Sequence, residues 1–163
     1  MIGGASEGQA ISPLLLNNQP LGFTDSYKYL GVDICAGRCL TFSATNTIRS
    51  FHRAANSVLY SRVKPKNEVL MRILYTNCVP IITYASAAKE FSATDMTRCH
   101  VAVNNCIRRI FSFALWESIR HLRISYGYDS IYEIFASSKV KFMTKATASS
   151  NTIVKFLSSL PIV

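Results

Sequence analysis

Acidic residues are scarce in this sequence, which has 9 Asp and Glu against 18 Lys and Arg and a formal net charge of +9 at pH 7. Its four aspartates, Asp25, Asp33, Asp95 and Asp129, are isolated, and the sequence contains no Asp-Asp pair. Two-metal catalysis of nucleotidyl or phosphoryl transfer needs carboxylates grouped around the ions. We therefore expect no such catalysis, and no bound metal cofactor, from this chain alone.

Long apolar runs are also missing. The longest charge-free stretch of the basic part, residues 73–88, contains Asn77 and Pro80 and is shorter than the roughly 20 residues that a spanning helix needs. The first ten residues lack the positive and apolar regions of a secretory signal. The sequence predicts an intracellular location, the nucleus included, and no membrane partner.

Paired cysteines and catalytic histidine motifs are absent as well. The five cysteines are an odd number without close pairing, and Cys35 and Cys39 lack a second Cys or His pair at zinc-site spacing. His52, His100 and His121 lie in helical segments, outside any recognisable nucleophile motif. We interpret the cysteines as buried thiols and the histidines as core or surface residues rather than as ligands or catalysts.

What the sequence has is enough apolar surface for one folded unit, because 49% of its 163 residues are hydrophobic. Apolar and aromatic residues over 11–34, with turn residues at Asn17-Asn18, predict a β-hairpin or short meander. The segment 35–39 would be a flexible joint into a helical part. The predicted fold class is α+β, mostly α, with a small N-terminal β-hairpin followed by a bundle of five or six helices.

Helical spacing of apolar residues begins near residue 45, where Thr45 or Asn46 could cap the first helix. Ser92, with Asp95 three residues later, predicts the start of a long helix. The predicted helices cover about 45–62, 66–78, 92–113, 116–124, 130–146 and 151–160, and residues 81–91 are expected to continue as helix beyond Pro80. The predicted buried residues of the first three are Ile48, Phe51, Ala55, Val58 and Leu59; Val69, Leu70, Ile73 and Leu74; and Met96, Val103, Ile107 and Ile110.

Positive charge is concentrated after residue 40. Residues 1–40 carry 2 basic and 3 acidic residues, whereas residues 41–163 carry 16 basic and 6 acidic residues. Such an excess favours a polyanionic partner, although a generic basic surface would have the same composition. Arg49, Arg53 and Tyr60 recur at helical steps, so one helix face could contact successive phosphates. The candidate nucleic-acid-binding residues are Arg49, Arg53, Tyr60, Arg62, Lys64 and Lys66, and the alternative is a solvated helix face beside a basic loop.

One string resembles a known family. Residues 27–34, YKYLGVDI, resemble the block that follows the catalytic palm motifs in reverse transcriptases of non-LTR retrotransposons. The order that follows is also similar: a basic helix, then Leu74-Tyr75, Pro80 and Thr83-Tyr84, then a helix with Asn104-Asn105 and Arg108-Arg109. The resemblance covers roughly residues 20–145. The family's Asp-Asp motif, which lies upstream of this block, has no counterpart here.

The resemblance implies that the chain is a fragment of an RNA-directed DNA polymerase that lacks the fingers and most of the palm. Residues 1–40 would be a β-hairpin remnant of the palm, with Tyr29, Leu30 and Gly31 close to the primer end, and residues 41–163 a helical thumb. Its partners would be RNA, an RNA–DNA or DNA duplex, and the missing palm and fingers, and divalent metal would belong only to the complete polymerase. The alternative is a stand-alone basic helical domain that binds other proteins.

Overall fold

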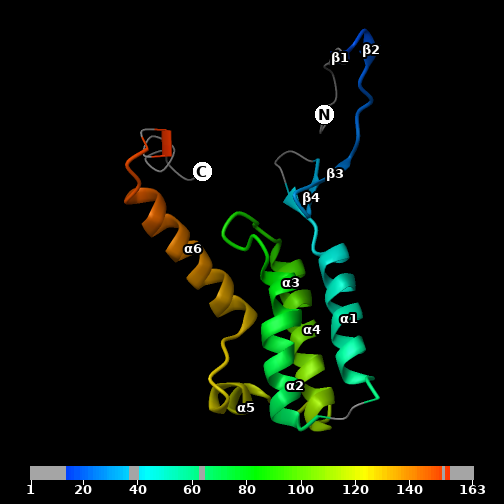
Figure 1. The fold of residues 1–163 in the computed structure, drawn as a ribbon, viewed down its shortest axis with the longest axis vertical. Coiled ribbons are helices and arrows are strands. Elements are labelled where there is room, and N and C mark those ends of the chain that lie inside the picture. The colour runs from blue at the N-terminus through cyan, green and yellow to red at the C-terminus, as the bar shows by residue number, and fades with distance from the viewer. Residues whose placement is uncertain (1–13, 37–40, 63–64, 152, 155–163) are drawn as a thin grey trace.

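A computed structural model describes residues 14–36, 41–62, 65–151 and 153–154. Short antiparallel strands lie at one end of a set of packed helices, and the N-terminal strands extend away from the helices (Figure 1). This arrangement confirms the predicted α+β, mostly α fold with an N-terminal hairpin followed by five or six helices. No helix within the described ranges is long and apolar enough to cross a membrane.

The β part consists of two small antiparallel sheets. The first pairs β1 (Leu15–Leu16) with β2 (Gln19–Pro20), and the second has the order β3 (Ser26–Tyr29), β4 (Val32–Cys35) and β5 (Thr41–Phe42). Residues 35–39 were predicted to be a joint; residues 37–40 lie outside the described part. Because β5 pairs with β4, the sheet includes strands from both sides of residue 40.

The first helix, α1 (Thr45–Leu59), buries the predicted face. Phe51 and Ala55 are fully buried, and Ile48, Val58 and Leu59 pack partly buried against the same core. Two details of the prediction are wrong. The helix ends at Leu59 rather than near Arg62, and neither Thr45 nor Asn46 caps it, because Ala44 occupies the N-cap position without a side-chain hydrogen bond of its own.

The second helical run has three parts: α2 (Asn67–Ile73), the π-helical turn η1 (Leu74–Cys78) and α3 (Val79–Thr83). The π-helical turn ends at Cys78, two residues before Pro80, whose ring lacks an N–H and crowds the preceding turn of a regular α-helix. Met71, Leu74 and Cys78 form the buried face. Val69, predicted to be buried, is 45% exposed, because it lies two residues before Met71 and therefore on the opposite side of the helix.

The helix predicted beyond Pro80 stops early. It ends at Thr83, Tyr84 takes an extended conformation, and Ala85 has a φ of 54°, so residues 84–88 form turns rather than helix. The side chain of Lys89 is buried under this turn. Its Nζ donates to the Ile82 carbonyl at 3.2 Å and lies 4.9 Å from the centroid of the Phe91 ring. This buried ammonium satisfies a carbonyl at the end of α3, a device that apolar periodicity does not reveal.

The remaining helices are α4 (Ala93–Phe111), α5 (Arg120–Ser125) and α6 (Ile131–Thr147). Ser92 caps α4 as predicted, and α4 buries Val103, Ile107 and Ile110, with Met96 half-buried. The helix predicted from Trp116 begins only at Arg120, and Trp116 is 88% exposed. The last predicted helix, 151–160, lies largely outside the described residues. In Figure 1, α5 is at the opposite end of the bundle from β3 and β4, and α6 diverges from the other helices.

Candidate nucleic-acid interface

The outer face of α1 carries the predicted pair of arginines. Since Phe51 and Ala55 fix the inward face, Arg49 and Arg53 lie exposed and four residues apart, which puts them on one side of the helix. Among the residues that the structure describes, neither forms a salt bridge. Both guanidinium groups are therefore available to an anion.

Tyr60 lies at the end of this row but outside the helix proper. It is the C-cap residue of α1 and is 76% exposed, so its ring projects into solvent just beyond the last helical turn. Four residues of α-helix rise by about 6 Å. The Arg49–Arg53 step is therefore close to the roughly 6.8 Å that two nucleotides of one strand cover along a duplex axis.

Arg62 and Lys66 add exposed positive charge on the loop that follows α1. Arg62 is exposed directly after α1, and Lys66 is exposed at the N-cap position of α2. Lys64 lies outside the described residues. Arg62 and Lys66 thus belong to the connection between the end of α1 and the start of α2.

The predicted hairpin residues lie near the other end of α1. Tyr29 pairs with Val32, and the two residues between them, Leu30 and Gly31, both have positive φ, of 45° and 79°. Two consecutive positive-φ residues are the mark of a type I′ hairpin turn. Tyr29 is 59% exposed and Leu30 is 72% exposed, so the tip presents a large apolar side chain to solvent.

A groove of about 370 Å³ separates the hairpin from α1 and α3. Hairpin, α1 and the end of α3 all contribute to it, and its lining residues are Lys28, Gly31, Asp33, Asn46, Thr47, Ser50, Pro80, Ile81 and Tyr84. The Tyr84 ring approaches the turn so closely that a Cβ at Gly31 would lie 3.5 Å from Tyr84 Cε1. The Tyr84 ring therefore lies beside the hairpin turn.

Polar contacts connect this groove to the arginine row. Asn46 Nδ2 donates to Asp33 Oδ2 at 3.1 Å, and Arg49 Nη1 donates to Asn46 Oδ1 at 3.4 Å. Asp33 belongs to β4 and Asn46 to the first turn of α1, so the amide bridges sheet and helix. The structure thus brings the hairpin and Arg49 together, which spacing along the sequence could not show.

Lys28, Asn46 and Tyr84 contribute to this surface and were not predicted as site residues. Lys28 brings an ammonium group to the groove, and Tyr84 is 55% exposed. Lys28 and Tyr84 lie within the strings that carry the family resemblance, and that is the only sequence signal for them. Asn46 was expected, as an alternative to Thr45, to cap α1, because Asn is a common N-cap residue.

The sequence contains a second basic pair, Arg108-Arg109. Helical spacing predicts both side chains on a solvated face of α4, and this prediction is wrong for Arg108. Arg109 is exposed, but Arg108 is half-buried and donates from Nε to the Glu117 carbonyl and from Nη1 to Asn105 Oδ1, both at 3.1 Å. The bond to the Glu117 carbonyl fastens the loop before α5 to α4, so Arg108 has a structural role.

Among the described residues, no three His, Cys, Asp or Glu side chains lie close enough together to hold a metal ion. Burial raises the pKa of the Cys99 and Cys106 thiols to about 11, which keeps both protonated near neutral pH.

Comparison of this chain with protein families, with curated proteins and with solved structures found no match.

Proposed function

We propose that this chain binds a nucleic-acid duplex or structured RNA through backbone phosphates, as the thumb of a non-LTR-type reverse transcriptase would. The observation that carries the proposal is the exposed pair Arg49 and Arg53, which no carboxylate of the described residues neutralises. Arg62, Lys64 and Lys66 extend the same positive surface along the sequence, and Tyr60 adds a ring for stacking or a hydroxyl for a phosphate.

The hairpin fits the same proposal. In a complete polymerase, Tyr29, Leu30 and Gly31 would lie beside the primer end while α1 follows the duplex. An exposed leucine at positive φ is an energetically unfavourable choice for a turn, and such residues cluster at functional sites. The fingers and the rest of the palm, with the metal-binding carboxylates, would come from the missing part of the protein.

The test is the effect of salt and of the arginine pair on binding. Fluorescence anisotropy would measure the affinity of the chain for RNA–DNA duplexes of two unrelated sequences over a series of salt concentrations. Removing both guanidinium groups by Arg49→Ala/Arg53→Ala should weaken binding to both duplexes by similar factors, because phosphate contacts carry no base information. The slope of log affinity against log salt should become shallower by about one unit per lost contact.

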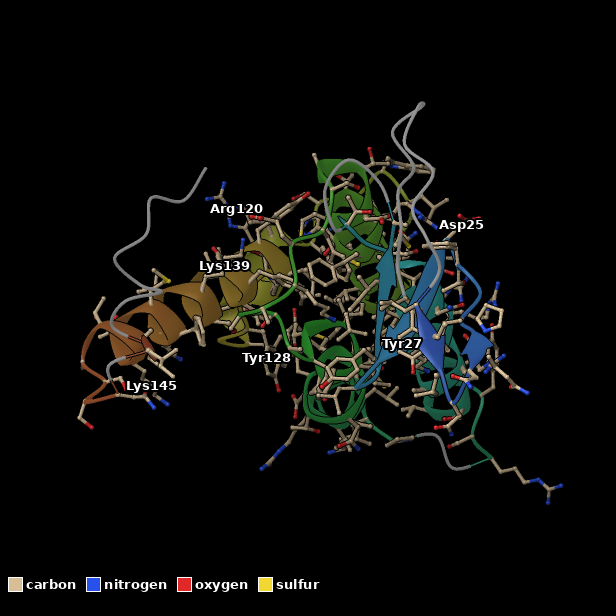
Figure 2. All side chains as sticks on the ribbon, turned by 90° about the horizontal axis from the view of Figure 1, so that it is seen from above. Asp25, Tyr27, Arg120, Tyr128, Lys139 and Lys145 are labelled. Atoms are coloured by element: carbon tan, nitrogen blue, oxygen red, sulfur yellow. The ribbon has the colours of Figure 1, made fainter. Side chains whose placement is uncertain are left out.

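The matched control is Lys141→Ala/Lys145→Ala, which removes two exposed charges at the same helical spacing from α6. Lys145 lies at the outer end of α6, on the other side of the molecule from the hairpin residue Tyr27 (Figure 2). Both double variants should keep the parent's circular dichroism spectrum and melting temperature, since exposed positions shift stability by less than about 0.5 kcal/mol. Equal affinity and equal salt slope in the arginine variant and the parent would contradict the proposal.

A protein-binding domain remains the second candidate, because exposed apolar side chains of α6 favour it. The C-terminal half of α6 exposes Val140 (65%), Phe142 (52%) and Met143 (38%), an apolar content that a solvated helix does not need. Binding through such a surface would be insensitive to salt and to Arg49 and Arg53. The salt series therefore separates the two candidates.

A further inference from the structure

A second pocket lies at the far end of the bundle from the hairpin, between α4, the segment leading into α5, and the start of α6. Its volume is about 340 Å³. The lining residues are predominantly polar and are His100, Asn104, Arg108, Ser118, Ile119, Arg120, Arg123, Ser130 and Tyr132. None of them belongs to the surface formed by α1 and the hairpin, and α5 is at the opposite end of the bundle from β3 and β4 (Figure 1).

Positive charge in this pocket is poorly compensated. Three guanidinium groups line it, those of Arg108, Arg120 and Arg123, and no carboxylate is among its described lining residues. The carboxylate that comes near is Glu133 Oε2, 3.8 Å from Arg123 Nη2. That oxygen also accepts a hydrogen bond from the Ser130 backbone N–H at 2.5 Å in the capping box of α6, and its 3.8 Å separation from Arg123 Nη2 is longer than a hydrogen bond.

Arg123 is the most unusual member of the pocket. It is only 8% exposed, and its Nε is buried with no hydrogen-bond partner among the described residues. Burial of an arginine is costly unless its charge is paired and its N–H groups are bonded. The described residues therefore supply no hydrogen-bond acceptor for Arg123 Nε.

His100 has the same deficit. Asn104 Nδ2 lies 2.9 Å from His100 Nε2, and with the amide donating to that nitrogen the neutral ring carries its proton on Nδ1. Nδ1 is buried and also has no hydrogen-bond partner within the part of the chain that the structure describes. Burial, followed by the positive charges of Arg123 and Arg108, lowers the pKa of His100.

We propose that this pocket binds a phosphate group, either inorganic phosphate or the phosphate of a small phosphate monoester. A phosphate offers several acceptor oxygens and two negative charges, and planar guanidinium groups bind it in a bidentate manner. The volume lies within the range of small-molecule pockets and exceeds what a phosphate alone occupies, leaving room for an organic group beside the half-exposed ring of Tyr132. This proposal does not depend on nucleic-acid binding by α1.

Calorimetric titration with inorganic phosphate, adenosine 5′-monophosphate and adenosine tests the proposal, with sodium chloride keeping the ionic strength constant. Binding of inorganic phosphate alone identifies free phosphate as the ligand, and tighter binding of the monophosphate identifies a monoester. In either case phosphate should raise the pKa of His100, followed by NMR, because the bound dianion offsets the charges of Arg123 and Arg108. Absence of binding by both phosphate compounds, or equal binding of adenosine and its monophosphate, would overturn the proposal.

The variant that decides the location is Arg120→Ala, because Arg120 is exposed and its loss should not disturb folding. We expect affinity for phosphate to fall about tenfold, the effect of one lost charge-assisted hydrogen bond. Arg109→Ala is the matched control, since Arg109 is an exposed arginine of α4 that does not line the pocket. The proposal fails if Arg120→Ala and Arg109→Ala bind phosphate equally well. The Arg49→Ala/Arg53→Ala variant should bind phosphate like the parent.

Discussion

The carboxylate of Asp95 accepts a hydrogen bond at 3.2 Å from the backbone N–H of Ala44, a residue 51 positions earlier in the chain. Ala44 is the N-cap residue of α1 and has no side chain with which to cap it. Asp95 lies in the first turn of α4, where its own N–H donates to Ser92 Oγ and its other oxygen contacts Arg98 at 2.7 Å. One carboxylate therefore joins the N-termini of the two helices that carry much of the core.

Replacing Asp95 with Ala should lower the free energy of unfolding by about 1–2 kcal/mol, because it removes a cap and leaves the Ala44 N–H without its acceptor. Urea denaturation would measure the change. Arg98→Ala is the control, since it removes only the exposed partner of Asp95, and such ion pairs contribute about 0–1 kcal/mol. If the two variants lose the same small amount, the bridge to Ala44 does not stabilise the fold.

The hairpin turn offers a test with the opposite sign. Leu30 has a positive φ that only Gly, Asn and Asp adopt readily, so Leu30→Asn should stabilise the chain by up to about 1 kcal/mol. Gly31→Ala should destabilise it by about 1 kcal/mol, because alanine is strained at a φ of 79°. Thermal unfolding of both variants would check these signs, and destabilisation by Leu30→Asn would mean that the leucine side chain packs more favourably than its 72% exposure indicates.

The same turn could serve as a functional test. If Leu30 lies against the primer end in a complete polymerase, evolution would keep a strained leucine for contact with nucleic acid or with the palm. The stabilised Leu30→Asn variant should then bind an RNA–DNA duplex no better than the parent. A parallel rise in stability and affinity would show that rigidity of the turn, rather than its side chain, limits binding.

Local patterns predicted the local features of the fold. The turn residues Asn17-Asn18, the buried stripe of α1 and the cap at Ser92 each depend on a few neighbouring residues, so the sequence shows them directly. The errors arose where distant residues decide the outcome. The cap of α1 comes from Asp95, and the chain beyond Thr83 turns over a buried Lys89 instead of continuing as helix.

The candidate site divides in the same way. Helical spacing alone predicted that Arg49 and Arg53 share a face, and the structure agrees. No spacing rule could predict that Asn46 would bridge Asp33 and Arg49, because that contact depends on how the sheet docks on α1. Nothing in the sequence indicated the pocket around Arg123 either, because an arginine in a helix is normally solvated and its burial depends on distant residues.

Tyr75 should make stability depend on alkaline pH. Its ring stacks on Tyr128 with centroids 4.0 Å apart, its hydroxyl donates to the Asp129 carbonyl at 3.2 Å, and burial raises its pKa from 10.0 to about 12. Between pH 10 and 12 the unfolded chain loses the phenol proton while the folded chain keeps it. The contribution of Tyr75 to stability is therefore fully present below pH 10 and is lost as the pH rises toward 12.

The Tyr75→Phe variant tests this linkage. At pH 7 it should be less stable than the parent by about 1 kcal/mol, the worth of one hydrogen bond. Because phenylalanine does not ionise, the difference should shrink when urea denaturation is repeated above pH 10. Tyr60→Phe, at a 76% exposed position, should leave stability unchanged at both pH values. A constant difference between parent and Tyr75→Phe across the pH range would contradict the raised pKa.

The last prediction is that the isolated chain self-associates through its N-terminal strands. Leu15 and Leu16 are 65% and 60% exposed. The strand β3 lies at the edge of its sheet, and all of its residues are exposed. Unprotected edges and clustered exposed apolar residues promote association between chains. In the proposed parent protein, the rest of the palm would cover this region.

Light scattering after size exclusion, over a range of protein concentrations, would measure the association. It should strengthen as salt is raised, because salt screens the repulsion that a net charge of +9 imposes between copies. Leu15→Ser/Leu16→Ser should reduce it, whereas Val140→Ser/Phe142→Ser, at comparably exposed positions of α6, should not. If only the α6 variant becomes monomeric, the chains associate through the C-terminal half of α6. That result would favour a protein-binding domain over a polymerase fragment, because the associating surface would then not be the strands that the palm is proposed to cover.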